Sequence, residues 1–477
     1  MQRTAVDHRD SEHALINIDT TLEPASLRPG LTRLWEVSGP KVKRLCLRSA
    51  PELATPVYTV DGRYTARGWT EWTQGFLYGE AILQFDATGD EEALDIGRRL
   101  TRDSMSPHHT HEGVHDHGFN NVSTYGNLRR LMLEGHIPFD AWELAFYENA
   151  LQVSGAVQAM RWTETVDAGG FIHSFNGPHS LFCDTMRSLR SLVLAHHLGH
   201  RLLGENDRPI SLLERAVQHA ATTATYNVYY GDGRDIYDMR GRVAHESLFN
   251  VTDGNYRAPS TQQGYSPFTT WTRGLSWVMS GYAEQLEFLD TVEDAELEPV
   301  GGREQVRSMM LAAATAACDF YIDQTPLDGV PYWDTGAPGL AMMGAYLDRP
   351  AEPHNAHEPV DSSAAAIAAQ GLLRLGHYLT GSGDPAGDRY TKAGLTVLQT
   401  LLGDEYLSLD PDHDGILLHG VYHRPNGWDF APGDGGVPSG ESVMWGDYHL
   451  MEAALYTQRL ADASPYLTFF GPVEEKR

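Results

Sequence analysis

The pattern that most constrains the fold of this chain is a succession of helical segments of about 15–20 residues, joined by short polar connections. We predict about twelve such helices, the weakest near Leu31–Leu47. The others are Trp69–Thr88, Glu91–Ser104, Asn120–Glu134, Phe139–Met160, Cys183–Leu198, Pro209–Tyr226, Trp271–Phe288, Arg303–Asp323, Asp361–Leu379, Asp384–Leu402 and Trp445–Leu460. A chain of this kind is predicted to be all-α.

The predicted helices are of two kinds. Trp69–Thr88 and Asp361–Leu379 are rich in Gly, Ala and aromatic residues and nearly free of Lys and Arg. Small residues all round a helix allow neighbours on every side, so these helices should be central. Glu91–Ser104 and Asp384–Leu402 carry a charged face and should be peripheral. The alternation predicts a closed double ring of helices rather than an open solenoid, which would usually show a fixed sequence period.

Three long irregular segments interrupt the helices: Gly231–Pro267, Gln324–Val360 and Tyr406–Met444. Long loops in a compact domain are usually functional or disordered. Their aromatic residues favour order and a lined cleft; these are Tyr332, Trp333, Tyr422 and Trp428. No composition shift marks a domain boundary. We therefore predict one domain over residues 31–465, an N-terminal tail or arm over 1–30 and a C-terminal tail over 466–477.

The composition of the chain limits the kinds of molecule that it is expected to bind. The chain has 477 residues, with 36 Lys+Arg against 64 Asp+Glu and a formal net charge of −28. This charge argues against binding nucleic acid or anionic membranes, but a locally basic pocket would still accept an anionic substrate. No run is long and apolar enough for a membrane helix, and the N-terminus lacks the apolar core of a secretion signal. Cys46, Cys183 and Cys318 form no paired set, so a cytoplasmic location is expected.

Histidines cluster in one short stretch, where His115–Phe119 reads His-Asp-His-Gly-Phe and follows His108, His109 and His111. The cluster fits a metal site, an acid/base site or a polar loop. His111 and His115 have the i, i+4 spacing that two zinc ligands can use. Gly113 lies between them, however, and no Cys or HExxH pattern accompanies them. Structural or solvated histidines are therefore the favoured interpretation over a metal site.

Two carboxylates stand at predicted helix starts. Asp116 follows a loop and precedes a helix, and Asp184 begins a mostly apolar one. Capping the helix is the usual role of an aspartate at such a position. The apolar residues Leu181, Phe182 and Cys183 would partly desolvate Asp184, however. Desolvation raises a carboxyl pKa, as a general acid at neutral pH requires.

Trp271 and Trp277 flank Arg273 where another helix opens. Aromatic residues at this spacing are normally core. A buried arginine, in contrast, must find an anion or a carbonyl. Tryptophans that line a cleft also offer flat apolar faces suited to the C–H surfaces of sugars.

Taken together and in order, these segments resemble the unsaturated glucuronyl hydrolases, glycoside hydrolase family 88. The resemblance runs from about Tyr64 to Leu460, and the ordered set is far more specific than any one motif. The matching segments are Trp72–Phe76 with Gly79, His115–Phe119, Asp184–Met186, His245, Gln263–Tyr265, Trp271–Gly274 with Trp277, Val360–Ala369 with Gly371–Leu373, and Trp445–Tyr448.

The resemblance implies an (α/α)6 barrel, which agrees with the double ring. It implies an enzyme acting on lyase-generated oligosaccharides that carry a 4,5-unsaturated uronic acid at the non-reducing end. The reaction is hydration of the vinyl ether: a carboxylic acid protonates C4, water adds at C5, and the resulting hemiketal opens and releases the glycosidic link. No metal or organic cofactor is implied.

By position, the resemblance makes Asp184 the general acid/base and Asp116 the second essential acid, which hydrogen-bonds the sugar and tunes Asp184. Arg273 would contact the substrate's carboxylate or neighbouring hydroxyls. The positions matching substrate-binding residues are Trp72, His115, His245, Gln263, Trp271, Arg273 and Trp277.

The chain departs from the family pattern in several places. Phe175-Asn176 stands where a Trp is common, and Ser188 where an Asn is common. Extra length falls in Leu286–Gly302 and Gln324–Val360. No Lys or Arg lies between residues 424 and 459. If this segment lies at the rim of the cleft, binding a sulfate group there would require a cation. Substrates without heavy sulfation are therefore expected.

Three other functions remain open from the sequence. One is another (α/α)6 carbohydrate enzyme acting on saturated substrates: an inverting glycosidase, a polysaccharide lyase or a sugar epimerase. The second is a non-enzymatic carbohydrate-binding or helical scaffold protein. The third is a zinc hydrolase built on the histidine cluster.

Overall fold

The computed structural model describes residues 16–48, 55–66, 71–432, 436–465 and 468–470. The start of the predicted helix Trp69–Thr88 and parts of both predicted tails lie outside these residues. Within them the chain is mainly helical, as predicted.

Each predicted helix is present. Asn120–Glu134 was predicted as one helix but starts earlier, at His117, and contains a π-helical turn, η4; Cys183–Leu198 is divided at Leu189. The short helix α11 (Asp294–Leu297) is additional. The other helices are α1 (Arg28–Arg48), α2 (Gln74–Thr88), α3 (Glu91–Ser104), α4 (His117–Asn121), η4 (Val122–Gly126), α5 (Asn127–Leu133), α6 (Ala141–Met160), α7 (Thr185–Ser188), α8 (Arg190–His197), α9 (Leu212–Tyr226), α10 (Thr272–Leu289), α12 (Arg303–Asp323), α13 (Ser362–Gly381), α14 (Ala386–Leu401) and α15 (Met444–Ala461).

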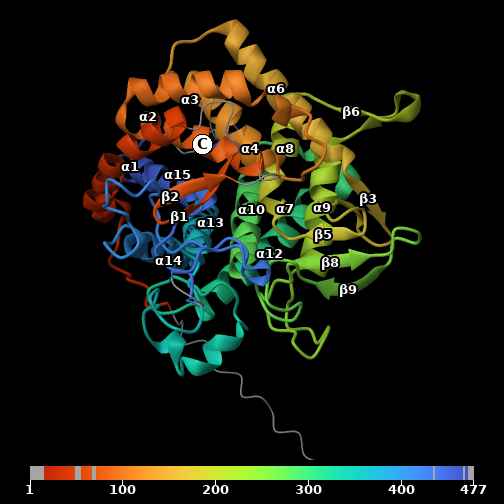
Figure 1. The fold of residues 1–477 in the computed structure, drawn as a ribbon. Helices are drawn as coiled ribbons and strands as arrows, with labels where there is room; N and C mark the ends of the chain where they lie inside the picture. Colours follow the sequence, from red (N-terminus) through yellow and green to blue (C-terminus); the bar gives the residue numbers. More distant parts are fainter. Residues whose placement is uncertain (1–15, 49–54, 67–70, 433–435, 466–467, 471–477) are drawn as a thin grey trace, which may run out of the picture.

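The contacts between successive helices form a closed ring. Helix α2 packs against α4, α4 against α7, α7 against α10, α10 against α13, α13 against α15, and α15 against α2. A second set lies outside this ring: α1 and α3 on α2, α6 and α9 on α8, α12 on α10, and α14 on α13. Figure 1 shows α10 near the middle of the molecule, with α3, α9 and α14 towards its edge.

Burial confirms which helices are central. Every residue of α10 is buried, and so is nearly all of α13. Small residues permit this: a Cβ at Gly371 would lie 2.8 Å from the backbone nitrogen of Ser280 on α10. Helix α3, by contrast, buries one apolar face and exposes its charged residues. The predicted central and peripheral roles of these helices are therefore confirmed.

Short antiparallel strands, which the sequence did not predict, occupy the connections. They pair as β1 (Pro56–Val60) with β2 (Arg63–Ala66), β3 (Trp162–Thr165) with β4 (Gly169–Ile172), β6 (Leu202–Leu203) with β7 (Pro209–Ile210), and as the sheet β5 (Ser180–Phe182), β8 (Glu246–Phe249), β9 (Tyr256–Ser260) in that order. The last sheet positions part of the site, because β5 leads directly into Cys183 and Asp184. It also contains two short stretches of the segment 231–267, which was expected to be irregular.

The described parts of both predicted tails pack on the domain. The Ile16 and Asn17 amides donate to the carbonyls of Ile322 and Leu327, and Ile16 is buried. At the other end Phe469 and Phe470 are buried. None of the described helices is long and apolar enough to cross a membrane. Cys46, Cys183 and Cys318 are buried and unpaired.

Candidate active site

A cavity of about 350 Å³ opens where the N-terminal ends of α4, α7 and α10 meet. The structure brings eight of the nine predicted site residues to its wall. These are Trp72, His115, Asp116, Asp184, Gln263, Trp271, Arg273 and Trp277. The ninth, His245, lies directly behind the wall: its ring centroid is 4.9 Å from that of Trp271, and its Nδ1 accepts the Gln262 amide at 3.0 Å.

Neither carboxylate acts as a helix cap. Asp116 and Asp184 occupy the N-cap positions of α4 and α7, yet neither side chain accepts a capping hydrogen bond. Asp116 is 8% exposed and Asp184 7% exposed, and both line the cavity. The ordinary structural role of a helix-start aspartate is therefore absent here, and both groups are available for chemistry.

His115 lies between the two carboxylates. Its Nε2 is 3.5 Å from Asp184 Oδ1 and 3.8 Å from Asp116 Oδ1. Burial acts to lower the pKa of His115, but the two carboxylates outweigh burial and raise it above its ordinary value. The two carboxylates therefore favour the protonated form of the buried His115 ring.

The direction for Asp184 corrects the expectation from its apolar neighbours. Burial alone would raise the pKa of Asp184, but the adjacent His115 outweighs it and the pKa falls below its ordinary value. The pKa of Asp116 shifts in the opposite direction. Burial raises it above its ordinary value, although the nearby His115 acts to lower it. In the free cavity, therefore, Asp116 holds a proton to higher pH than Asp184 does.

Ser188, one of the departures from the family pattern, holds the turn that carries His115 and Asp116. Its Oγ accepts the Gly118 amide at 2.9 Å and the Gln158 Nε2 at 2.9 Å, and donates to the His115 carbonyl at 2.8 Å. A Cβ at Gly118 would lie 2.4 Å from the Ser188 carbonyl oxygen, so only glycine allows α4 and α7 to meet this closely.

Aromatic rings form much of the wall. Trp72 stacks on Trp445 at a centroid distance of 4.9 Å, and Phe119 contacts Trp277 at 4.7 Å. Phe175, which replaces the common Trp, lies nearly parallel to the His115 ring at 6.1 Å. Tyr422 and Trp428, expected to line a cleft, do so. Sequence reasoning missed the remaining wall residues, which lie beside the motifs or in the long loops: His111, Gly113, Val114, Phe119, Gln262 and His423.

Arg273 is committed to other protein groups. Its Nη1 donates to Asp361 Oδ2 at 2.9 Å and to the Val421 carbonyl. Its Nη2 donates to the Tyr422 carbonyl at 2.6 Å and to Gln263 Oε1 at 3.3 Å. The four terminal N–H groups thus all have acceptors. The arginine holds the segment that carries Tyr422 against α10 and α13.

Most of the histidine cluster is structural. His117 Nδ1 pairs with Ser154 Oγ at 3.0 Å, and its Nε2 with the His111 carbonyl at 2.9 Å. Burial lowers the pKa of His117 to about 4, so it is neutral. His115, Asp116 and Asp184 have ligand atoms within 4.8 Å of one another, close enough to hold a metal ion.

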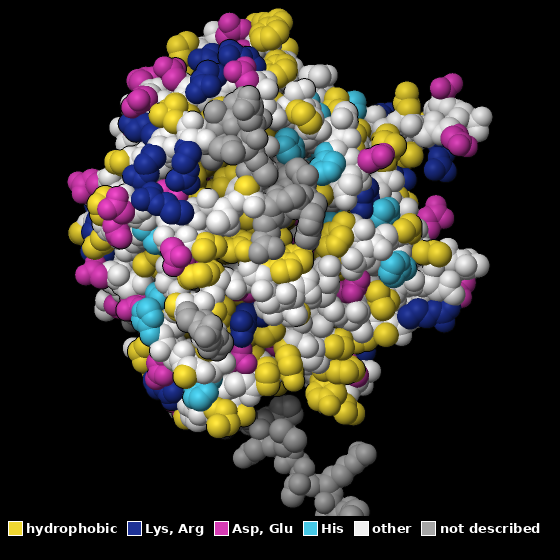
Figure 2. All heavy atoms as spheres, in the orientation of Figure 1, with side chains coloured by type: hydrophobic (Ala, Val, Ile, Leu, Met, Phe, Trp, Pro, Cys, Tyr) yellow, Lys and Arg dark blue, Asp and Glu magenta, His cyan; other side chains and the backbone are white. Residues whose placement is uncertain are grey.

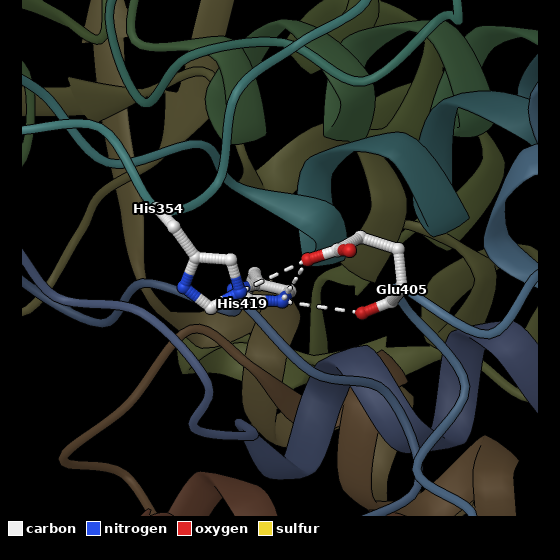
Figure 3. Close-up of side chains that lie close together, drawn as sticks. All are labelled: His354, Glu405 and His419. Carbon is white, nitrogen blue, oxygen red and sulfur yellow. Dashed lines mark hydrogen bonds and ion pairs between the residues drawn. The ribbon is translucent and has the colours of Figure 1, made fainter.

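A second group of this kind, His354, Glu405 and His419, lies outside the cavity (Figure 3). Glu405 Oε1 is 3.0 Å from His354 Nε2 and 3.4 Å from His419 Nε2. The Gly440 amide donates to His419 Nδ1 at 2.9 Å, so the proton of the neutral ring sits on Nε2 and points to the Glu405 carbonyl. With this tautomer His419 Nε2 has no lone pair for a metal. The three side chains are therefore better explained as hydrogen-bonded contacts that connect loops.

No protein-family profile matches the chain. An unsaturated glucuronyl hydrolase from Bacillus sp. (strain GL1) is 26% identical over 410 residues, covering 83% of this chain and 89% of the relative. An unsaturated chondroitin disaccharide hydrolase from Streptococcus pyogenes serotype M1 is 24% identical over 429 residues, covering 87% of each.

Solved structures of such enzymes have a fold similar to that of this chain. The unsaturated glucuronyl hydrolase from Bacillus sp. GL1 superposes with a TM-score of 0.67 at 22% identity, covering 90% of this chain and 97% of that one. An unsaturated glucuronyl hydrolase specific for heparin gives a TM-score of 0.68 at 21% identity, covering 91% and 98%. The chain therefore shares the fold of these enzymes over nearly its whole length.

Proposed function

Because the chain belongs to the unsaturated glucuronyl hydrolase family, we propose that it hydrolyses oligosaccharides ending in a 4,5-unsaturated uronic acid. The observation that carries the proposal is the arrangement of His115 within 3.8 Å of both Asp116 and Asp184, in a cavity walled by aromatic rings. The carboxylates supply acid/base chemistry, and the flat rings suit the apolar faces of a sugar.

In the proposed reaction, the Asp184 carboxyl group donates its proton to C4 of the vinyl ether. Its carboxylate then accepts a proton from the water that adds at C5, which restores the acid. The hemiketal opens, the bond to the next sugar is lost, and one water is consumed overall. Asp116 holds the sugar hydroxyls. A uronate that enters this cavity adds a negative charge, which raises the carboxyl pKa values and favours protonated Asp184.

The separation of the carboxylates favours this reaction over the inverting glycosidase alternative. Oxygens of Asp116 and Asp184 lie within 4.8 Å of each other. Inverting enzymes hold their carboxyl groups about 6.5–9.5 Å apart, to leave room for a water on the far face of the sugar. The gap here is too small for that geometry.

The substrate is proposed to lack sulfate. Arg273 is the single Lys or Arg among the described residues that line the cavity, and its terminal N–H groups are occupied. Relatives are named both for glucuronyl substrates and for chondroitin disaccharides.

The helix contacts support an (α/α)6 barrel with an inner ring of α2, α4–α5, α7–α8, α10, α13 and α15. We assign residues 31–465 to this one domain. A cytoplasmic location stays a prediction, which rests on the three unpaired cysteines.

The test is the ultraviolet absorbance of the conjugated uronate. Lyase-generated disaccharides should lose this absorbance when the protein is added, and Asp184→Asn should slow the loss by about 10²–10⁴-fold. Since Asp184 makes no capping bond, the variant should melt like the parent protein. Activity on saturated glycosides alone would contradict the proposal, no activity of the parent protein would point to a binding protein, and full activity of the variant would point to another catalytic group.

A further inference from the structure

Three arginines converge on one buried carboxylate, away from the residues that line the cavity. Arg44 and Arg48 lie four residues apart on one face of α1, and Arg63 begins β2. Their guanidinium nitrogens are 3.5, 2.6 and 3.1 Å from the carboxylate of Asp414. We call these four residues the arginine patch.

The patch carries more positive than negative charge. Asp414 is fully buried, and among the described residues it is the one carboxylate that forms an ion pair with any of the three arginines. One of its oxygens also accepts the Tyr64 amide at 3.1 Å. Among the described residues, three positive charges therefore share one carboxylate, on a chain whose net charge is −28.

This imbalance is unlike the other arginine clusters of the molecule. Arg130 and Arg459, for example, share two carboxylates, Asp86 and Glu134. The patch arginines also remain accessible, with side chains 39%, 41% and 51% exposed. Figure 2 shows Lys and Arg side chains gathered over α1 and the β1–β2 hairpin.

The shared carboxylate also fixes the arginines in place. Each guanidinium has five N–H donors in a rigid fork, so most of the fifteen donors are left over after Asp414 is satisfied. Forks of this kind match carboxylate groups, with two parallel hydrogen bonds each. A pre-positioned set of guanidinium groups loses less entropy on binding an anion than free side chains would.

We propose that the arginine patch is a second binding site, which takes carboxylate groups of uronic-acid oligosaccharides outside the catalytic cavity. The choice of a uronate ligand rests on the proposed function; the anion site itself rests on the charges. Docking there would raise the local concentration of anionic chains against the repulsion of the acidic protein.

The experiment measures binding of a saturated oligogalacturonate by isothermal titration, with a neutral malto-oligosaccharide of the same length as the comparison ligand. Arg48→Gln combined with Arg63→Gln should weaken binding of the acidic chain about tenfold. Asp414→Asn should strengthen it, because the amide oxygen of Asn can still accept from the arginines while the negative charge of the patch is lost. Arg33→Gln is the matched control, since Arg33 is also on α1 but pairs with Asp404 rather than with the patch carboxylate Asp414; this variant should bind normally.

Melting temperatures check that each variant is folded. Equal affinity of the parent protein, the double variant and Asp414→Asn would overturn the site, and so would equal binding of the neutral chain. Hydrolysis of an unsaturated disaccharide is measured in parallel. If the parent protein hydrolyses the disaccharide but the patch variants bind oligogalacturonate as it does, only the second site is refuted. If the parent protein does not hydrolyse the disaccharide, the proposed function is refuted.

Discussion

At the scale of single residues, His115 affects the pKa values of both aspartates that line the cavity. It lies close to both carboxylates, and its positive charge lowers the pKa of Asp184. His245 also flanks Asp184, but burial lowers its own pKa to about 4, so it is neutral near pH 7. The two imidazoles therefore have different electrostatic effects on the same acid.

This difference predicts two pH profiles. A general acid works in its protonated form, so activity falls as the pH rises through its pKa. His115→Gln removes the group that lowers the pKa of Asp184, so the alkaline side of the kcat/KM profile should move to higher pH. His245→Gln removes a ring that lowers the pKa of Asp184 less than His115 does, so it should move that side less. A downward or absent shift in His115→Gln would contradict the assignment of Asp184 as the acid.

The sequence identified both carboxylates, because each stands in a motif at a helix start. It gave the wrong direction for the pKa of Asp184, because only the adjacent apolar residues were visible. The imidazole that reverses the shift is 69 positions away in the chain, and the fold brings it to 3.5 Å. The same limit applies to Arg273, whose acceptors at Val421 and Tyr422 are 148 and 149 positions distant.

At the scale of elements, Asp361 joins a helix cap to the wall of the cavity. Its Oδ1 accepts the Ser363 amide at the start of α13, and its Oδ2 pairs with Arg273, which holds the carbonyls of Val421 and Tyr422. One carboxylate thus fixes the start of an inner helix and the loop beside it.

Substitutions at Asp361 should separate these two roles. Asparagine is as good an N-cap as aspartate, so Asp361→Asn should lose mainly the ion pair and cost about 1–3 kcal/mol of unfolding free energy. Both substitutions remove the anion beside Arg273, but Asp361→Ala should lose the cap as well and leave the guanidinium no polar partner at this position, at about 3–5 kcal/mol. Chemical denaturation measures both. Equal losses would mean that the cap contributes nothing.

The contact between α4 and α7 depends on Gly118. An added Cβ there would lie 2.4 Å from a backbone oxygen of Ser188, which cannot move independently of α7. Gly118→Ala should therefore push apart the helix starts that carry Asp116 and Asp184, destabilise the protein by about 1–3 kcal/mol and lower kcat. Gly381→Ala is the matched control, since nothing lies within 4 Å of its Cβ position at the end of α13. A fully active, normally stable Gly118→Ala would show that this contact can relax.

The helices were predictable because long amphipathic and small-residue patterns are strong signals; Glu91–Ser104 and Arg303–Asp323 match α3 and α12 to the residue. The strands were not, because segments such as Leu202–Leu203 and Ser180–Phe182 are too short to show an alternating pattern. Their pairing depends on the partner strand, which the local sequence does not contain.

At the scale of the whole molecule, charge limits which substrates enter. The protein carries a formal net charge of −28, and its cavity holds two carboxylates. Arg273 is the one Lys or Arg among the described residues of the cavity wall, and its terminal N–H groups are already bonded. A sulfate group on the substrate would meet these two carboxylates, and the described residues of the wall offer it no Lys or Arg with a free terminal N–H group.

We therefore expect discrimination against sulfated substrates. Two unsaturated disaccharides that differ only by one sulfate should differ about tenfold or more in kcat/KM, in favour of the unsulfated one. The preference arises partly from long-range repulsion, which salt screens, so raising the ionic strength from about 0.01 M to 0.15 M should narrow the difference. A higher kcat/KM for the sulfated disaccharide would mean that a cation reaches the bound sugar after all. A difference that salt leaves unchanged would place the discrimination in short-range contacts within the cavity.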